Sequence, residues 1–379
     1  MSIPRRVAYI TGTRADFGLM QSTLQAIHAS PRLQLGVIVT GMHLDENLGG
    51  TVREVAAAGL KIIATVPVEP GTPTGALMAR NIAAMLRGFV GALETYDPDC
   101  VLVLGDRGEM LAAAIAGGHM SIPVIHIHGG ERSGTIDESV RHAISKLSHF
   151  HLVATEESRD RLIRMGEVPE TIRVIGAPGL DGLEELASHS RPELHAKLGL
   201  ATDAAVALLV YHPVLQEAEA AAKQAEIVLD ALLSSGMAIV ALKPNSDAGS
   251  RGILDVLEAH AAAGRIKLVS HLSRDEYLSM LRHASILIGN SSSGIIEAAS
   301  FGTPVVNVGS RQNFRQRNSN VIDVSADGSA IVSAIEEARK MGRQPIGNVY
   351  GDGRAGRRIV ELLETLSLPG NLLSKVNGY

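Results

Sequence analysis

The sequence predicts an α/β protein with two doubly wound, Rossmann-like parallel sheets that face each other across a central cleft. The first observation is that short apolar runs alternate with stretches of helical periodicity along almost the whole chain. The second is that these runs are nearly uninterrupted, which is typical of strands covered by helices on both faces. The third is the length of 379 residues, which is too long for one ordinary core.

The expected strands follow one another at regular spacing, with helical patterns between most of them. Two clear examples of such helical patterns are residues 81–96 and 220–236. Strands joined by helices in this way form parallel sheets, whose ligands bind at the carboxyl ends of the strands. The expected strands span residues 6–11, 33–40, 61–68, 100–106, 123–130, 150–155, 171–176, 205–213, 238–244, 266–270, 285–290 and 304–309.

A Gly/Pro-rich turn at 176–182 marks the expected boundary between the two domains. We expect a first Rossmann-like domain at 1–177 and a second at 178–356. A C-terminal helix at 357–379 is expected to rejoin the first domain.

Composition excludes several classes of protein. A net charge of −5 and 20% charged residues give no reason to expect a nucleic-acid or membrane partner. We expect no apolar run to be long enough to cross a bilayer. The N-terminal residues are expected to enter a strand directly, without a signal-peptide pattern. The single cysteine, Cys100, lies in an apolar run and is expected to be a small buried hydrophobe. A cytoplasmic enzyme is the expectation.

The most informative segment is 288–297, where an apolar strand runs into the turn Asn-Ser-Ser-Ser-Gly and then a helix. Backbone N–H groups and serine hydroxyls at such a turn can hold a phosphate. Glu297 lies one helical turn further on, where its carboxylate could accept both hydroxyls of a ribose. A plain helix cap would explain the same residues.

Polar residues also end three other expected strands. Arg14 follows a glycine turn, where its guanidinium suits a pyrophosphate, although a solvated loop arginine is the alternative. Asp106 closes a buried strand, either as a helix N-cap or as an acid/base group. His212 ends the first strand of the second domain, and its alternative is a turn histidine before Pro213.

The segment 126–142 holds the densest polar cluster of the chain. His126 and His128 are expected to share one strand face, because side chains in a strand alternate. Neither a zinc-ligand motif nor a metalloprotease spacing accompanies the histidines, so no metal is expected. The other ionisable members of the cluster are Glu131, Asp137, Glu138, Arg141 and His142.

One motif is misleading. Residues 351–356 fit the dinucleotide fingerprint GxGxxG, but they follow no clear strand and lie too near the C-terminus for a βαβ unit. We therefore expect no nicotinamide site there, and no cofactor elsewhere. The segment could still be a helix cap whose N–H groups face the cleft.

Seven motifs follow one another along the chain, namely TGTRADFG, GMHLDENLGGT, LGDRGE, HGGERSGTIDESVRHAISKLSH, YHPV, IGNSSSGIIEAASFGTPVVNVGSRQ and YGDG. As an ordered set they resemble the hydrolysing UDP-N-acetylglucosamine 2-epimerases of sialic-acid-type pathways. The resemblance covers about the first 360 residues, the span in which the motifs lie, and each motif alone is weak. It implies a glycosyltransferase-B-like fold of two domains, with the sugar site and the catalytic acids in the first domain and the nucleotide-binding site in the second. The version Arg-Ala-Asp-Phe of the first motif is similar to the hydrolysing branch.

The resemblance also implies roles for residues at matching positions. Asp106 and Asp137 match catalytic acids, and His212 matches a histidine near the diphosphate. The nucleotide-binding matches are Arg14, Ser291, Ser292, Gly294, Glu297 and Arg311, and the sugar-binding matches are His43, Glu138 and Arg141.

This chain departs from the family at one position. Family members carry Glu where it has His128, so the third acid/base group is His128, or its role passes to Glu131. The leading hypothesis is hydrolysis and epimerisation of UDP-GlcNAc to ManNAc and UDP, with a homodimer or homotetramer expected. The alternatives are the same reaction on a UDP- or GDP-linked 2,4-diacetamido-trideoxyhexose, a glycosyltransferase of the same fold, or a binding-only regulator.

Overall fold

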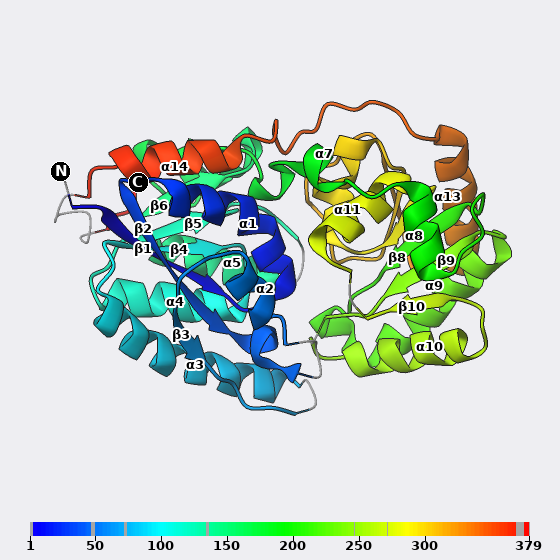
Figure 1. Cartoon of the computed structure of the whole chain (residues 1–379), viewed down its shortest axis with the longest axis horizontal. Helices are drawn as coiled ribbons and strands as arrows, with labels where there is room; N and C mark the ends of the chain where they lie inside the picture. Colours follow the sequence, from blue (N-terminus) through cyan, green and yellow to red (C-terminus); the bar gives the residue numbers. More distant parts are fainter. Residues whose placement is uncertain are drawn as a thin grey trace.

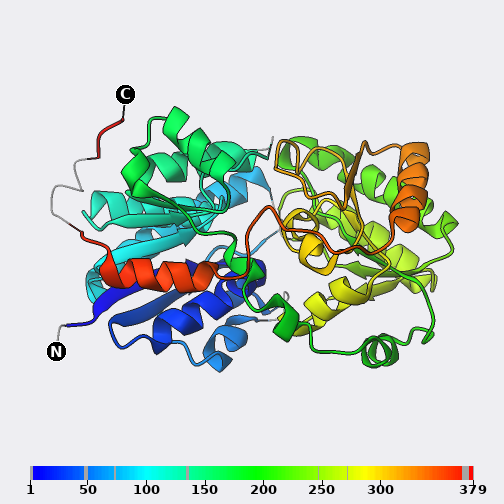
Figure 2. The ribbon, with the colours of Figure 1, turned by 90° about the horizontal axis from the view of Figure 1, so that it is seen from above.

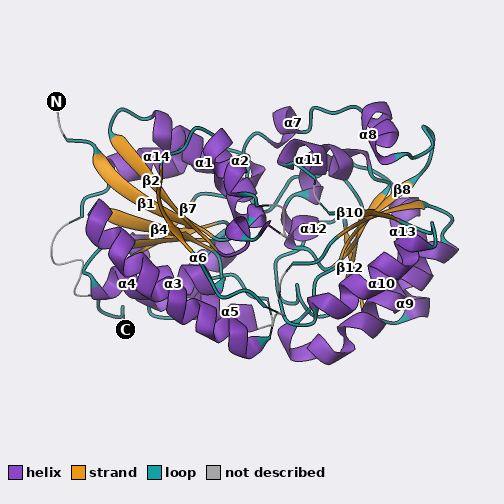
Figure 3. Cartoon of the chain, turned by 60° about the horizontal axis from the view of Figure 1, so that its bottom comes forward, coloured by secondary structure: helices purple, strands orange, loops and turns teal. Residues whose placement is uncertain are grey.

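The computed structural model describes residues 3–46, 50–71, 74–133, 136–245, 247–270, 272–368 and 375–378. In these ranges the chain forms two parallel sheets, each with helices on both faces (Figures 1 and 3). The expected fold class is therefore confirmed.

The first sheet has seven strands in the order β3-β2-β1-β4-β5-β6-β7. The order reverses beside β1, so a crevice is expected between the carboxyl ends of β1 and β4. The strands are β1 (Arg5–Thr11), β2 (Leu33–Thr40), β3 (Ile62–Val66), β4 (Cys100–Leu104), β5 (Val124–Ile127), β6 (Phe150–Val153) and β7 (Ile172–Val174).

The second sheet repeats this plan with six strands in the order β10-β9-β8-β11-β12-β13. Its order reverses between β8 and β11. The strands are β8 (Val206–Val210), β9 (Ala238–Leu242), β10 (Lys267–Val269), β11 (Ile286–Gly289), β12 (Val305–Val308) and β13 (Val321–Val324).

Helices join these strands and cover both sheets. The α-helices are α1 (Arg14–Ala29), α2 (Val52–Ala57), α3 (Gly75–Tyr96), α4 (Gly108–His119), α5 (Ile136–Leu147), α6 (Glu156–Arg164), α7 (Leu183–Leu186), α8 (Arg191–Leu198), α9 (Ala221–Ser234), α10 (Ser250–Ala262), α11 (Arg274–His283), α12 (Ser292–Ile296), α13 (Gly328–Met341) and α14 (Ala355–Thr365). The 3-10 turns are η1 (Gly41–Leu44), η3 (Pro169–Thr171), η4 (Pro178–Leu180), η5 (Leu215–Ala220) and η6 (Ala298–Phe301).

Each expected strand is present, and β13 is an additional one. It forms the edge of the second sheet, and none of its residues is fully buried. Cys100 is buried at the start of β4, as expected, and burial raises the pKa of its thiol to about 12.

Among the described residues one helix, α3, is long and apolar enough to cross a membrane, judged by length and composition alone. In this structure α3 packs on α4 and β3 instead. The backbone of Gly88 lies against Val66 of β3 so closely that a Cβ would overlap its side chain. These contacts make α3 part of the helical layer over the first sheet.

The C-terminal helix is shorter than expected. The expected helix was 357–379, whereas α14 ends at Thr365, and residues 369–374 and 379 lie outside the described part. Pro369 follows closely in the sequence, and the residue before a proline avoids helical geometry. Figure 2 shows α14 alongside α1, and its Ile359 and Leu363 join the first core.

The chain crosses between the two sheets twice, and the crossings lie side by side (Figure 2). The N–H of Ala177 donates to the carbonyl of Tyr350 at 2.8 Å. Gly176 and Gly351 sit there with φ of +85° and +128°, which favours glycine. The domain limits at 177 and 356 stay a prediction.

Candidate functional site

The polar residues expected at strand ends gather where the two sheets face each other. The turn after β1 and the end of β4 flank the switch point of the first sheet. The ends of β8 and β11 flank the switch point of the second sheet. Ion pairs connect the two sides, including Arg315 to Glu131 at 2.9 Å.

The turn after β1 is held rigid by a buried carboxylate. Asp16 accepts from the backbone N–H of Gly12 at 3.0 Å and of Thr13 at 2.7 Å, and it caps α1 together with the Thr13 hydroxyl. Burial, with nearby Glu109, raises the pKa of Asp16 to about 6. Arg14 is the first residue of α1 and is half-buried; burial lowers its pKa, against the opposing charge of Glu54. This capping fixes the start of α1, where Arg14 lies.

His43 lies beneath this turn. Its Nε2 is 2.9 Å from the Thr11 hydroxyl and its Nδ1 is 2.7 Å from the Thr51 hydroxyl. The side chain is fully buried, and burial lowers its pKa to about 4. The expected sugar contact of His43 is not supported, because both ring nitrogens already bond to protein.

Asp106 follows β4 and pairs with Arg141 of α5. The Arg141 side chain is only 1% exposed, and its Nη1 also donates to the carbonyl of Glu131 at 3.0 Å. Arg141 thus holds Asp106 and the backbone of Glu131 in place. Because it is buried and bonded to protein, the sugar contact expected for it is not supported.

His128 and Glu131 form a close pair. His128 Nδ1 is 2.5 Å from Glu131 Oε1, and Glu131 is 4% exposed. Burial alone would raise the pKa of Glu131, but Arg315 and His128 hold it at about 2. The ionised carboxylate can therefore accept the Nδ1–H of His128, which leaves Nε2 as a lone-pair acceptor.

The expectation that His126 and His128 share a strand face is wrong. β5 ends at Ile127, and His128 has a left-handed φ of +63°. His126 stays in the core, where its Nε2 lies 2.7 Å from the carbonyl of Gly105 and burial lowers its pKa to about 3. The positive φ turns the chain out of the sheet and separates the two rings.

The start of α5 faces the second sheet. Burial lowers the pKa of Arg311, and the negative charges of Asp137 and Asp247 oppose this shift. Asp137 and Arg311 therefore interact electrostatically, although they come from the two different halves of the chain. Glu138 accepts the N–H of Ser133 at 2.7 Å, so at least one of its oxygens braces the loop before α5.

His212 has a defined tautomer. Its Nδ1 accepts the backbone N–H of Asn245 at 3.2 Å, which assigns the ring proton to Nε2. Burial lowers its pKa to about 3, helped by the positive charge of Arg311. His212 is therefore a neutral donor at the end of β8.

Asn290 connects His212 to Arg311 through hydrogen bonds. Its side chain accepts the N–H of His212 and donates to the His212 carbonyl, both at 2.8 Å. Its own carbonyl accepts from Arg311 at 3.1 Å and from Gln312 at 2.9 Å. The sequence analysis missed Asn290, although it directly precedes the serines.

The serines after β11 cap a short helix. Ser291 is the N-cap of the five-residue α12, and its hydroxyl accepts the Ser293 N–H at 3.3 Å. Ser292 is half-buried at the first helical position. Gly294 packs on the sheet, where a Cβ would come within 2.9 Å of a Val305 methyl. Close packing therefore explains Gly294 better than the nucleotide contact expected for it.

Glu297 is 2% exposed and pairs with Arg274, a residue that the sequence analysis did not single out. Arg274 also donates to the carbonyl of Gly179 at 3.0 Å. One Glu297 oxygen is therefore held by the protein in this arrangement.

The GxGxxG segment has a structural role. The N–H groups of Ala355 and Gly356 both donate to the Asp181 carboxylate, the first at 2.9 Å and the second at 2.5 Å. These two helix-start groups are occupied, so they do not face the cleft as free donors.

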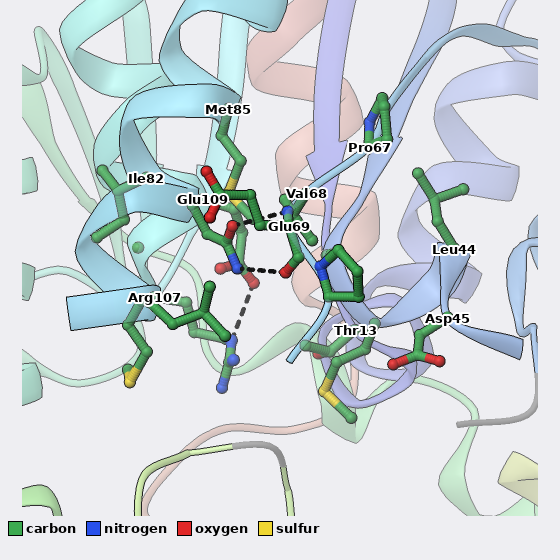
Figure 4. Close-up of a pocket in the computed structure, with 18 of the residues that line it drawn as sticks. Thr13, Leu44, Asp45, Pro67, Val68, Glu69, Ile82, Met85, Arg107 and Glu109 are labelled. Atoms are coloured by element: carbon green, nitrogen blue, oxygen red, sulfur yellow. Dashed lines mark hydrogen bonds and ion pairs between the residues drawn. The ribbon is translucent and has the colours of Figure 1, made fainter. Parts of the chain in front are cut away.

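A cavity of about 410 Å³ opens beside the turn after β1 (Figure 4). Arg107 and Glu109 form a polar corner, with Nε 2.9 Å from Oε1, and Asp247 reaches it from the second half. Asn81 braces one wall through two bonds to the backbone of Glu69. The apolar lining consists of Met42, Leu44, Val68, Leu77, Met78, Ile82 and Met85.

Among the described residues, no group of three or more His, Cys, Asp or Glu side chains could hold a metal ion.

Comparison with known proteins gives one consistent family. A family model described as UDP-N-acetylglucosamine 2-epimerase matches residues 25–364. A Legionella pneumophila protein named UDP-N,N'-diacetylbacillosamine 2-epimerase (hydrolyzing) is 47% identical, over 99% of this chain and 100% of that protein. The UDP-N-acetylglucosamine 2-epimerase of Neisseria meningitidis is 36% identical, over 96% of each chain.

A solved structure shares the fold. The crystal structure of UDP-GlcNAc 2-epimerase from Neisseria meningitidis bound to UDP-GlcNAc matches with a TM-score of 0.79 at 20% identity. The match covers 94% of this chain and 99% of that one.

Proposed function

The chain belongs to the UDP-N-acetylglucosamine 2-epimerase family, and from this we propose that it is a hydrolysing 2-epimerase of UDP-linked 2-acetamido sugars. The observation that carries the proposal is the His128–Glu131 pair, 2.5 Å apart, which Arg315 of the second half contacts, while Arg311 and His212 lie close to each other in that half. This arrangement combines a base, the His128–Glu131 pair, with two side chains that can stabilise a departing diphosphate, Arg311 and His212.

The reaction makes a specific demand on the site. The C2 proton of the sugar has no adjacent carbonyl, so its removal must accompany departure of the diphosphate from C1. The C2–H electron pair becomes the C1–C2 double bond of a 2-acetamidoglycal, and the C1–O electron pair leaves with UDP. A base and a stabilised leaving group are needed together.

His128 is our candidate for the C2 base. Ionised Glu131 holds the proton of His128 on Nδ1, so Nε2 is free to accept the C2 proton. This assignment gives the histidine that replaces the usual family glutamate a direct part in the chemistry. A His–Glu pair also stabilises the imidazolium that forms.

Arg14, His212 and Arg311 are our candidates for stabilising the departing diphosphate. Neutral His212 donates from Nε2, and Asn290 fixes its backbone. Arginine pairs well with diphosphate oxygens because its fork of donors matches them. Ser291, Ser292 and Glu297 remain the proposed contacts for the nucleotide.

In the second half-reaction water adds at C1 and a proton returns to C2 from the opposite face. Asp106 and Asp137 are the proposed acid/base groups for this step, the first held by Arg141 and the second beside Arg311. The overall products are UDP and the free sugar with inverted C2.

Two observations favour a diacetamido sugar nucleotide over UDP-GlcNAc as the substrate. The relative that is 47% identical bears the name of a UDP-N,N'-diacetylbacillosamine 2-epimerase, whereas the UDP-N-acetylglucosamine enzyme is 36% identical. The cavity beside Arg107 has an apolar wall as well as a polar corner, and that wall suits an acetyl and a methyl group. We propose a UDP-linked 2,4-diacetamido-2,4,6-trideoxyhexose as the preferred substrate, with UDP-GlcNAc as the second candidate.

Turnover in heavy water tests the proposal. Both sugar nucleotides are incubated separately with the protein, without an acceptor, and the released sugar is examined by NMR. We expect a C2-inverted sugar that carries deuterium at C2, formed faster from the diacetamido substrate. A C2-inverted product fully protonated at C2 would sink the elimination mechanism, and a product of unchanged configuration would sink the epimerase assignment.

A further inference from the structure

A loop of the second half reaches into the acid/base cluster of the first half. Arg315, between β12 and β13, has Nη1 2.9 Å from Glu131 Oε2 and Nη2 4.0 Å from Asp106 Oδ2. Its side chain is 10% exposed. Both carboxylates belong to the first half, so this one guanidinium spans the cleft.

The neighbouring residue secures the same loop. Phe314 has a left-handed φ of +66°, which is costly for a bulky residue. Its ring lies 4.3 Å from the guanidinium of Arg132, a residue of the first half. The cation–π contact offsets part of the backbone cost and keeps Arg315 directed at Glu131.

The charges around Glu131 make Arg315 the main counter-ion that comes from outside the first half. Burial raises the pKa of Glu131, and the positive groups that lower it are Arg315, His128 and Arg161. Arg141 donates to the Glu131 backbone carbonyl, and Tyr350 and His126 also lie within electrostatic range.

Building on the proposed function, we propose that Arg315 is a positioning residue that couples closure of the cleft to the basicity of the His128–Glu131 pair. With Arg315 on Glu131, the negative charge beside His128 is balanced, and less of that charge is left to hold a second proton on the ring. When the cleft opens, that charge is unbalanced and His128 is protonated more easily. The base is therefore available only around a closed site.

Two variants isolate this effect. Arg315→Met removes the cation with little change of volume, and Phe314→Ala removes only the stacking partner at a residue that is 57% exposed. Arg315→Lys keeps the charge. Arg339→Met, on the exposed face of α13, is the matched control for losing one arginine of the second half.

The measurement is kcat and KM as a function of pH. In Arg315→Met the acidic limb of kcat should move up by roughly one pH unit, the scale of one nearby charge at intermediate dielectric. Phe314→Ala should shift it less, Arg315→Lys should restore it, and Arg339→Met should match the wild type.

The outcomes separate the two proposals. An acidic limb unchanged in both Arg315→Met and Phe314→Ala overturns the role of Arg315 while leaving the epimerase assignment intact. If Arg315→Met does not fold, Phe314→Ala alone decides. Lack of turnover in the wild type overturns the function itself, and the positioning role falls with it.

Discussion

Buried ionisable side chains in this cleft have their charge or proton fixed by specific neighbours. Asp106 is the clearest example, because the side chain of its partner Arg141 is only 1% exposed. Removing one member of a buried pair leaves the other charge uncompensated. The proposed catalytic role of Asp106 and the stability of the fold therefore depend on the same ion pair.

We expect Asp106→Asn to lower turnover roughly a hundredfold or more, the usual scale for a general acid/base group. It should also destabilise the fold by about 3 kcal/mol, since Arg141 is left buried without a counter-charge. Turnover assays and urea unfolding would measure the two effects.

The double variant Asp106→Asn with Arg141→Met is the control. It should regain most of the stability and none of the activity. Normal turnover in the single variant would remove Asp106 from the mechanism.

At this scale the sequence predicted the residues that end strands, among them Asp106, Glu131 and His212. It missed Arg315 and Asn290, because their importance depends on partners that lie far away in the chain. It also assigned His43 to the sugar, since a motif does not reveal that both ring nitrogens face threonines.

At the scale of elements, the packing of α3 on β3 decides where glycine is needed. Gly88 and Gly91 lie in the same helix, but only Gly88 contacts Val66; a Cβ at Gly91 would meet nothing within 4 Å. Helix propensity alone favours Ala over Gly at both positions by about 1 kcal/mol.

We expect Gly88→Ala to be destabilising by about 1–3 kcal/mol, because overpacking against Val66 outweighs propensity. Gly91→Ala should instead stabilise by about 0.5–1 kcal/mol. Urea unfolding of the two variants compares them directly. Equal effects of the same sign would contradict the packing argument.

The strands with continuous apolar runs were all predictable, because such runs are buried on both faces. β13 was not, since Asp323 interrupts the apolar run of this edge strand and none of its residues is fully buried. The end of α14 was placed too late, because apolar residues continue in the sequence beyond Thr365.

At the scale of the whole molecule, the neutral buried histidines set the response to acid. Burial lowers the pKa of His43 to about 4, and those of His126 and His212 to about 3. Because the unfolded histidines bind protons below about pH 6.5, stability is fully present above that pH and is lost as pH falls toward these values. Asp16, with a pKa raised to about 6, opposes this trend.

We therefore expect the free energy of unfolding to fall as pH drops from 6.5 to 4.5, by up to about 1.4 kcal/mol per pH unit for each proton taken up. In His126→Gln the slope should flatten by about one proton. Urea unfolding across this range measures it, and an unchanged slope would show that His126 is protonated in the fold.

The two-sheet architecture followed from the sequence alone, because repetition of strand and helix is a local pattern. How the halves approach each other did not, since it depends on a few contacts such as Phe314 with Arg132. Those contacts link residues far apart in the chain and leave no periodic signal.

The paired crossings near Ala177 and Tyr350 have a mechanical consequence. Two tethers joined at one edge permit rotation about the line through them, whereas sliding or twisting would stretch one tether against the other. We therefore expect the gap between the halves to have a single degree of freedom, described by one angle. Sugar nucleotide and products then pass through the same mouth, at the rim farthest from that line.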